Sequence, residues 1–377
     1  MYRPITEISF QQVTNGRNMS FSFNFVNEFS ATDEWVNLTN ECKITFPKNM
    51  YVKDANGILQ PLGGTQSDLQ VNNLFQRGDK VTVKYGYWLE DGNSSVTLIF
   101  QGYISKVTSK KPIQLECQNN MWKLKQIPCK RQVWSSSLKS LFQLLLAGTE
   151  FTVNQLSDVN IGSFIIENET VAQLCERLRK DFHIESYFRG NELRLGLSPY
   201  IASEAVTTNV FAFQQNIISD QLDFQRKDDI KLSAVCQSIN TVSAGYNKKG
   251  EEKTKKERLT VLVYTDSSGN FQHIVKKKGE ELPANTEGER RTLFFPNISD
   301  VTTMVNLGIA ELKKYYYTGF KGKFTTFAYP FVKLGDHIQI IDHIMPDRSG
   351  KYVVRGVEYT GGKDGHRQII SLDYKLL

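Results

Sequence analysis

Hydrophobic and polar positions alternate with a period of two along the first hundred residues. Phe21, Phe23 and Phe25 are separated by Ser22 and Asn24, so the three rings share one face of an extended strand. Similar runs, bounded by turn-forming residues, predict strands at 42–46, 80–87, 96–100 and 103–107. This spacing of short strands indicates a small barrel or sandwich over residues 1–112.

The period changes to that of helices after residue 113. Leu138, Leu141, Phe142 and Leu145 recur on one face of a predicted helix. Gly148 stands where a helix C-terminal cap belongs, so we expect the helix to end there.

A second helix is predicted over residues 170–181, because Thr170 and Gln173 have the spacing of a capping box. Two strands follow it, at 183–188 and 192–197. Together these elements predict a compact α+β domain over 113–205, inserted after the first β region. The apolar stripes of its helices are interpreted as core and not as a cofactor site.

The β pattern returns after about residue 206 and continues to the end of the chain. A second β region is predicted over 239–377, with one helix at about 300–317. Within it, the segment 247–258 holds six basic and three acidic residues and no apolar one. This composition predicts a solvated hairpin tip or an exposed loop. Its lysines are candidate contacts with a partner: Lys248, Lys249, Lys253, Lys255 and Lys256.

Two stretches far apart in the sequence resemble each other. The first is FQRGDKVTV (75–83) and the second is FVKLGDHIQI (331–340). Each is followed by a strand that contains a glycine, FQGYISKV (100–107) or YVVRGVEY (352–359), and then by another apolar strand. The matched residues are Phe75, Gly78, Asp79 and Gly102 in the first copy and Phe331, Gly335, Asp336 and Gly356 in the second.

The repeated Gly-Asp pair is typical of a tight turn that begins a strand. Glycine permits the turn, aspartate ties it by bonding the backbone, and the alternating β-branched residues start the strand. Because several features recur in the same order, they predict two related barrels in one chain, the second at about 320–377. The predicted fold class is mainly β with α+β: two similar small antiparallel β-barrels plus the inserted α+β domain.

Composition excludes several classes of protein. A hydrophobic fraction of 40% is sufficient for packed cores, which excludes a disordered chain. The net charge of +6 is too mild to require a polyanionic partner. The five cysteines contain no CxxC pair, which indicates reduced, buried thiols and no zinc site. No apolar run is long enough to span a bilayer, and the N-terminus shows no secretory signal.

Motifs that carry chemistry are missing from the sequence. It contains no GxSxG, HExxH, P-loop or GxGxxG pattern, so we predict no catalytic, metal or cofactor-binding residues and no cofactor. The pairs Asp336–His337 and Asp342–His343 would lie about 20 Å apart on one extended strand, too far to share a site. The glycine-rich segment 361–366 is interpreted as a hairpin turn.

Two alternatives stay open at this point. Carboxylates are abundant enough to supply the acid pair of a tail-associated cell-wall hydrolase. A small barrel with exposed aromatic rings and nearby lysines is also compatible with binding of single-stranded nucleic acid.

The order of these blocks resembles the baseplate hub family of contractile phage tails. That family includes the Mu-type hub, the late control proteins of temperate phages and the hub part of type VI secretion spikes. The resemblance spans nearly the whole chain. It is carried by the first Gly-Asp strand with FQGYISKV and PIQLECQNNMWKLKQ, by TVAQLCERLRKDFHIESYF, and by the C-terminal block from GFKGKFTTFAYPFVKLGD to GHRQIISLDYKLL.

The resemblance implies a structural protein without enzymatic activity. Three chains with two barrels each would form a ring that adapts a six-fold tail tube to a three-fold spike. The implied partners are further copies of the chain in a homotrimer, the tail spike protein, the tail tube or its initiator, and baseplate wedge proteins. DNA would pass through the lumen without specific binding. The implied location is the virion, after synthesis in the host bacterial cytoplasm.

The family pattern also implies a long-range connection. After the middle domain the chain would return and complete the first barrel with residues at about 206–238.

Overall fold

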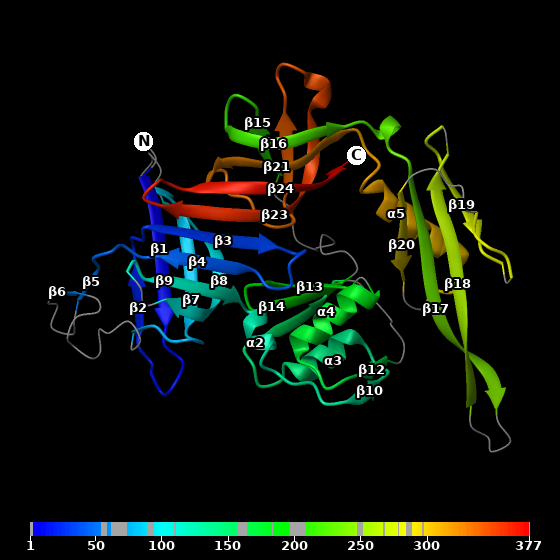
Figure 1. Ribbon diagram of the computed structural model, residues 1–377, viewed down its shortest axis with the longest axis horizontal. Coiled ribbons are helices and arrows are strands. Elements are labelled where there is room, and N and C mark those ends of the chain that lie inside the picture. The colour runs from blue at the N-terminus through cyan, green and yellow to red at the C-terminus, as the bar shows by residue number, and fades with distance from the viewer. Residues whose placement is uncertain are drawn as a thin grey trace.

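A computed structural model describes the chain in thirteen stretches: residues 3–53, 59–61, 74–88, 94–108, 111–156, 164–182, 184–196, 208–246, 252–266, 268–277, 279–283, 289–295 and 298–376. These residues are mainly β-strand and pack around three clusters of buried side chains (Figure 1). The largest cluster lies under a 13-stranded sheet that contains both ends of the described chain.

The N-terminal part of this sheet, which we call unit 1, is built mostly from the first 120 residues. Its strands are β1 (Arg3–Gln11), β2 (Ser20–Phe23), β3 (Glu28–Glu34), β4 (Glu41–Thr45), β7 (Lys80–Trp88), β8 (Ser94–Thr108) and β9 (Gln114–Asn119). A separate short pair is formed by β5 (Tyr51–Lys53) and β6 (Leu59–Pro61). The strands expected at 96–100 and 103–107 are one continuous strand, β8, with a register shift against β7 between Val83 and Lys84.

The C-terminal part of the same sheet, which we call unit 2, consists of six strands. They are β15 (Thr208–Ala212), β16 (Ile217–Gln225), β21 (Gly319–Phe327), β22 (His337–Ile341), β23 (Gly350–Gly362) and β24 (Arg367–Leu376). Two short 3₁₀ turns accompany them, at Lys227–Asp229 and Pro346–Arg348. Antiparallel pairing of β3 with β23 joins the two units into one sheet.

A middle domain between β9 and β15 has its own buried cluster. Its elements are α2 (Met121–Leu124), β10 (Gln132–Trp134), α3 (Leu138–Leu145), β11 (Thr152–Gln155), β12 (Phe164–Ile166), α4 (Val171–Phe182), β13 (Glu185–Arg189) and β14 (Glu192–Gly196). The predicted capping box is confirmed: the Thr170 N–H donates to Gln173 Oε1 at 2.8 Å, and the Gln173 N–H donates to Thr170 Oγ1 at 3.3 Å.

A third cluster belongs to a unit inserted between β16 and β21. Its strands are β17 (Leu232–Tyr246), β18 (Glu252–Thr265), β19 (Phe271–Val275) and β20 (Glu289–Phe294), in the sheet order β19-β18-β17-β20. Helix α5 (Val301–Lys313) packs on this sheet and is capped by Asp300, which accepts from the Thr303 N–H at 2.6 Å. Figure 1 shows β17 and β18 as a long hairpin that extends past the other elements.

The expectation that residues at about 206–238 complete the first barrel is wrong. Strand β15 pairs with β22, and β16 pairs with β21, so both belong to unit 2. Strand β17, which begins at Leu232, belongs to the inserted sheet. The physical reason is that the third unit is inserted in unit 2 between β16 and β21, so strands that pair in space are far apart in the sequence.

The basic segment 247–258 is also not a loop along its whole length. Residues from Glu252 onward form the first part of β18, where the backbones of Lys255 and Lys256 pair with β17. Lys248 and Lys249 lie outside the described residues, and Lys253 is placed only by its backbone in β18. A backbone ladder can order such a segment without burying any apolar side chain.

Candidate functional site

The first Gly-Asp turn leads into β7 and is fixed by three hydrogen bonds. The Gly78 N–H donates to the Ile104 carbonyl at 2.8 Å, and the Ile104 N–H donates to the Asp79 carbonyl at 2.9 Å. The Gln76 N–H donates to Asp79 Oδ2 at 2.9 Å. Gly78 has a φ of +95°, a conformation that side chains other than glycine rarely adopt.

The second Gly-Asp turn leads into β22 and repeats these contacts. The Gly335 N–H donates to the Val354 carbonyl at 3.0 Å, and the Val354 N–H donates to the Asp336 carbonyl at 2.9 Å. The Lys333 N–H donates to Asp336 Oδ2 at 2.9 Å, and Gly335 has a φ of +82°. The predicted repeat is therefore also a repeat of hydrogen bonding.

The two units share the same strand order around these turns. Unit 1 runs β3-β4-β9-β8-β7-β1, and unit 2 runs β16-β21-β24-β23-β22-β15. Even an irregularity recurs, because β8 and β23 both shift register against the next strand immediately after Ile104 and Val354. One difference is the last strand of this order: β1 is antiparallel to β7, whereas β15 is parallel to β22.

Two of the residue matches drawn from the sequence are displaced. Because Gln76 and Lys333 make the same bond, the counterpart of the buried Phe75 is the buried Val332 and not Phe331. Phe331 instead stacks on the Tyr359 ring at 5.5 Å between centroids. Sequence alignment missed this because the second copy is one residue longer before its glycine.

The glycines of the following strands are not counterparts either. Gly102 lies two residues before Ile104, whereas Gly356 lies two residues after Val354. A Cβ at Gly102 would meet the Gln118 carbonyl of β9 at 2.0 Å. A Cβ at Gly356 would meet the Glu34 side chain of β3 at 2.6 Å. Each glycine permits close approach of a strand, but of a different one.

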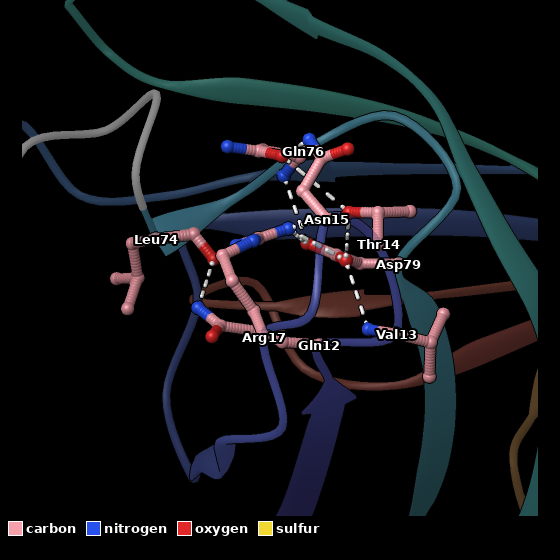
Figure 2. Close-up of polar contacts among 8 residues, drawn as sticks. All are labelled: Gln12, Val13, Thr14, Asn15, Arg17, Leu74, Gln76 and Asp79. Carbon is pink, nitrogen blue, oxygen red and sulfur yellow. Dashed lines mark hydrogen bonds and ion pairs between the residues drawn. The ribbon is translucent and has the colours of Figure 1, made fainter.

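Asp79 anchors the loop between β1 and β2, as Figure 2 shows. Its carboxylate forms an ion pair with Arg17 at 2.7 Å. It also accepts hydrogen bonds from the Thr14 hydroxyl at 3.0 Å and the Val13 N–H at 3.2 Å. Only 2% of the Asp79 side chain is exposed. These hydrogen-bond donors therefore compensate for the hydration that the carboxylate loses on burial.

Asp336 faces a different environment, a cavity of about 640 Å³ lined by side chains from both units and the middle domain. Burial raises the pKa of Asp336, and the positive charges of Lys333 and Arg189 oppose that rise. Asp33 from β3 lines the same cavity, and burial raises its pKa to about 6 against the pull of Arg189 and Lys333. Acidic and basic side chains thus line one cavity between unit 1, unit 2 and the middle domain.

His366, in the turn between β23 and β24, connects unit 2 to unit 1. Its Nδ1 lies 3.1 Å from the Gly86 carbonyl, which can only accept, so Nδ1 carries the proton. Its Nε2 therefore accepts from the Thr6 hydroxyl at 2.9 Å. The Tyr87 hydroxyl donates to the His366 carbonyl at 3.2 Å, and burial lowers the pKa of the imidazole to about 4.

The sequence indicated the hairpin turn at 361–366 but not this role of His366. The partners of the imidazole lie on β1 and β7, more than 270 positions away in the chain. No local motif encodes such a contact, so only the folded structure shows it.

Among the described residues, no group of three or more His, Cys, Asp or Glu side chains is arranged to hold a metal ion. The pairs Asp336–His337 and Asp342–His343 lie at opposite ends of the extended strand β22. Within the same described part, no helix is long and apolar enough to cross a membrane.

Comparison with solved structures identifies the fold. The chain is similar to the tail protein from Neisseria meningitidis MC58, with a TM-score of 0.56 and 12% identity over 99% of this chain and 97% of that one. It is similar to the 43 kDa tail protein of prophage MuSo2 from Shewanella oneidensis, with a TM-score of 0.55 and 12% identity over 98% of each chain.

A larger protein contains the same fold as one part. The chain is similar to a chain of the Francisella PdpA–VgrG complex, with a TM-score of 0.52 and 7% identity over 99% of this chain and 53% of that one. No protein-family model and no curated protein sequence matches the chain. These structural neighbours are thus a tail protein, a prophage tail protein and a chain of a PdpA–VgrG complex, and the chain has their fold.

Proposed function

We propose that the chain is the structural hub of a phage tail baseplate or of a related contractile injection machine. The observation that carries this proposal is the pair of equivalent units in one chain, with the same strand order and the same Gly-Asp turns. Three chains would supply six such units around one axis. Within one chain, unit 1 is joined to unit 2 by unlike strands, β3 and β23. If contacts between chains repeat this junction, they are heterologous, and heterologous contacts form a ring when the rotation closes.

This arrangement gives the ring two kinds of face. The six units offer six nearly equal docking surfaces to a six-fold tail tube, its initiator or wedge proteins. The middle domain and the third unit occur once per chain, so they offer three surfaces to a three-fold spike. DNA passes through the lumen without specific binding, and the location is the virion. The mechanism is geometric and uses no catalytic residue or cofactor.

The structural neighbours support a role in a tail or spike assembly, but they indicate no particular contact between chains. Two of them are described as tail proteins, and the third is part of a PdpA–VgrG complex. The low identity makes this a likeness of fold, so the assembly has to be tested on the chain itself.

The experiment is to measure the mass of the purified full chain in solution by sedimentation equilibrium over a concentration series. A monomer has a mass of 43.1 kDa, and we expect a closed trimer as the largest species. Image averages of the same sample by electron microscopy should show a ring with six similar lobes. A dimer with two-fold symmetry, or a chain that stays monomeric at its highest soluble concentration, contradicts the proposed ring.

A further inference from the structure

Among the open strand edges of the described chain, two are equivalent to edges that are paired within the chain. Strand β16, at one end of the large sheet, pairs with β21 and with no other described strand. The last residues of β8, Lys106–Thr108, pair with β9 on one side and with no described strand on the other. Open strand edges present unpaired N–H and C=O groups and are sites for pairing with another chain.

The chain itself shows what the counterparts of these edges do. Strand β3 of unit 1 pairs antiparallel with β23 of unit 2, with Glu34 opposite Gly356 and Thr32 opposite Glu358. The pair is reinforced by the Ser30 hydroxyl, which donates to Glu358 Oε1 at 3.0 Å. This is the junction between consecutive units within one chain.

The hydrogen bonds of the two units fix which residues correspond. Ile104 and Val354 make the same bonds to the Gly-Asp turns, so positions 106–108 of β8 correspond to positions 356–358 of β23. On the other edge, β16 holds the place beside β21 that β3 holds beside β4. Following the registers through β9 and β24 places Asp223 at the position of Thr32 and Gln225 at the position of Glu34.

We propose that β16 of one copy pairs antiparallel with the end of β8 of a second copy of this chain. The register places Asp223 opposite Thr108 and Gln225 opposite Lys106, as Thr32 faces Glu358 and Glu34 faces Gly356 within the chain. The proposal rests on the proposed ring and specifies its interface between chains. Since the relation is head to tail, each copy uses β16 on one side and β8 on the other.

Exposure agrees with this assignment. Asp220 and Asp223 on β16 are exposed, whereas their counterparts Phe29 and Thr32 on the paired strand β3 are buried and half-buried. Strand β3 is covered by its pairing with β23, whereas the equivalent positions of β16 are exposed. We therefore expect β16 to pair with a further strand.

Charge agrees as well. Strand β16 presents the exposed carboxylates of Asp220 and Asp223. The open end of β8 presents Lys106, with 64% of its side chain exposed, and the exposed Lys111 follows shortly after. Opposite charges on two edges of one chain favour pairing between copies and disfavour β16 with β16 or β8 with β8.

Disulfide cross-linking tests the register. The double variant Thr108→Cys, Asp223→Cys is expected to form disulfides between chains under mild oxidation, giving a covalent trimer on a non-reducing gel. Its matched control is Thr108→Cys, Ser219→Cys, in which the second thiol is displaced by roughly 13 Å along the strand and cannot reach. The five native cysteines are buried and give little background.

The internal junction provides a positive control. The variant Thr32→Cys, Glu358→Cys places thiols on residues that lie opposite each other within one chain, so it should form a disulfide without raising the mass. If the 108–223 pair forms no more inter-chain disulfide than the 108–219 pair while this control is oxidised, the proposed interface is wrong.

Charge reversal provides a second readout. Asp220→Lys, Asp223→Lys is expected to abolish the trimer in sedimentation equilibrium, whereas Asp181→Lys, Asp347→Lys, which reverses two exposed charges elsewhere, should keep it. If the Asp220→Lys, Asp223→Lys variant stays trimeric and the Thr108→Cys, Asp223→Cys variant forms no disulfide between chains, this interface is overturned but the hub proposal stands. A chain that neither associates nor cross-links contradicts both.

Discussion

Asp79 and Asp336 occupy the same position in two copies of one turn, and each accepts a backbone N–H from the residue three positions earlier at 2.9 Å. Their outer surroundings differ. The Asp79 carboxylate forms an ion pair with Arg17 at 2.7 Å, whereas burial of Asp336 raises its pKa. The backbone geometry of the turn is therefore shared by both units, while the surroundings of the carboxylate, and so its contribution to stability, differ between them.

The first prediction concerns this difference. Asp79→Asn removes the negative charge beside Arg17 in a largely buried site, and breaking such a pair costs about 3 kcal/mol. Asp336→Asn is the matched variant and should cost less than about 1 kcal/mol, because an amide also accepts the backbone N–H and avoids a buried charge. Chemical denaturation of both variants at neutral pH measures the two free energies of unfolding. Equal losses would show that the ion pair contributes nothing.

A double-mutant cycle separates the ion pair from the turn. If Arg17→Met and Asp79→Asn are coupled, the double variant loses less stability than the two single variants together. Additive losses would mean that Asp79 acts only through its backbone contacts.

The second prediction concerns acid stability at the junction between the two units. The pKa of His366 falls from 6.5 to about 4 in the folded protein, so the unfolded chain binds a proton at higher pH than the folded one. The neutral imidazole therefore contributes fully to the free energy of unfolding above pH 6.5, and this contribution is lost as the pH falls toward 4. His366→Gln should flatten this decline, at a cost of about 1 kcal/mol near neutral pH for weakened bonds to Thr6 and Gly86.

His273→Gln is the control for this measurement, since His273 is exposed on β19. Unfolding free energies across the acid range should change slope for His366→Gln alone. An unchanged slope in that variant would contradict the role given to the buried imidazole.

The third prediction has the opposite sign with pH. Glu185 on β13 is largely buried, its Oε2 has no hydrogen-bond partner among the described residues, and burial raises its pKa from 4.5 to about 7. Arg179 and Lys314 oppose this rise, and Glu176 and Glu311 add to it. The stability associated with the neutral carboxyl is present below pH 4.5 and is lost as the pH rises through about 7.

Glu185→Gln should therefore stabilise the protein at alkaline pH by about 2 kcal/mol and change little at acid pH. Glu281→Gln is a control, since Glu281 is exposed. Thermal melts at both pH values measure the difference. Equal effects at both pH values would show that the Glu185 charge is not the cause.

The sequence could predict features whose cause is local. The Gly-Asp turns and the capping box at Thr170 depend on residues within a few positions, and the structure confirms their geometry. The assignment of β15 and β16 failed because strand pairing is not local: their partners β22 and β21 lie about a hundred residues further along the chain. The role of His366 depends on Thr6 and Gly86 in the other unit, so no neighbouring residue indicates it.

The last prediction concerns the outer half of the β17–β18 hairpin. Among the residues whose side chains the structure describes, these strands contribute five to the buried third cluster, all from the inner half: Leu232, Ala234, Cys236, Val261 and Val263. Beyond them, Asn240 lies opposite Glu257. Replacing residues 241–256 by Asn-Gly therefore closes the hairpin with a two-residue turn that fits antiparallel strands. We expect the melting temperature to stay unchanged, because every described buried side chain of the two strands stays in the shortened hairpin.

Two further variants make this test specific. Gly308→Val in α5 is the positive control: even a Cβ there would lie 2.6 Å from the Cys236 sulfur, so it should lower stability by about 1–3 kcal/mol. Serine at Lys248, Lys249, Lys253, Lys255 and Lys256 should leave the melting temperature unchanged, because the segment 247–258 holds no apolar residue and surface charges contribute little. If those lysines contact an acidic partner, both hairpin variants should weaken assembly, most at low salt, where screening is least. A fall of several degrees in the truncated chain alone would instead place the outer hairpin among the elements that stabilise the fold.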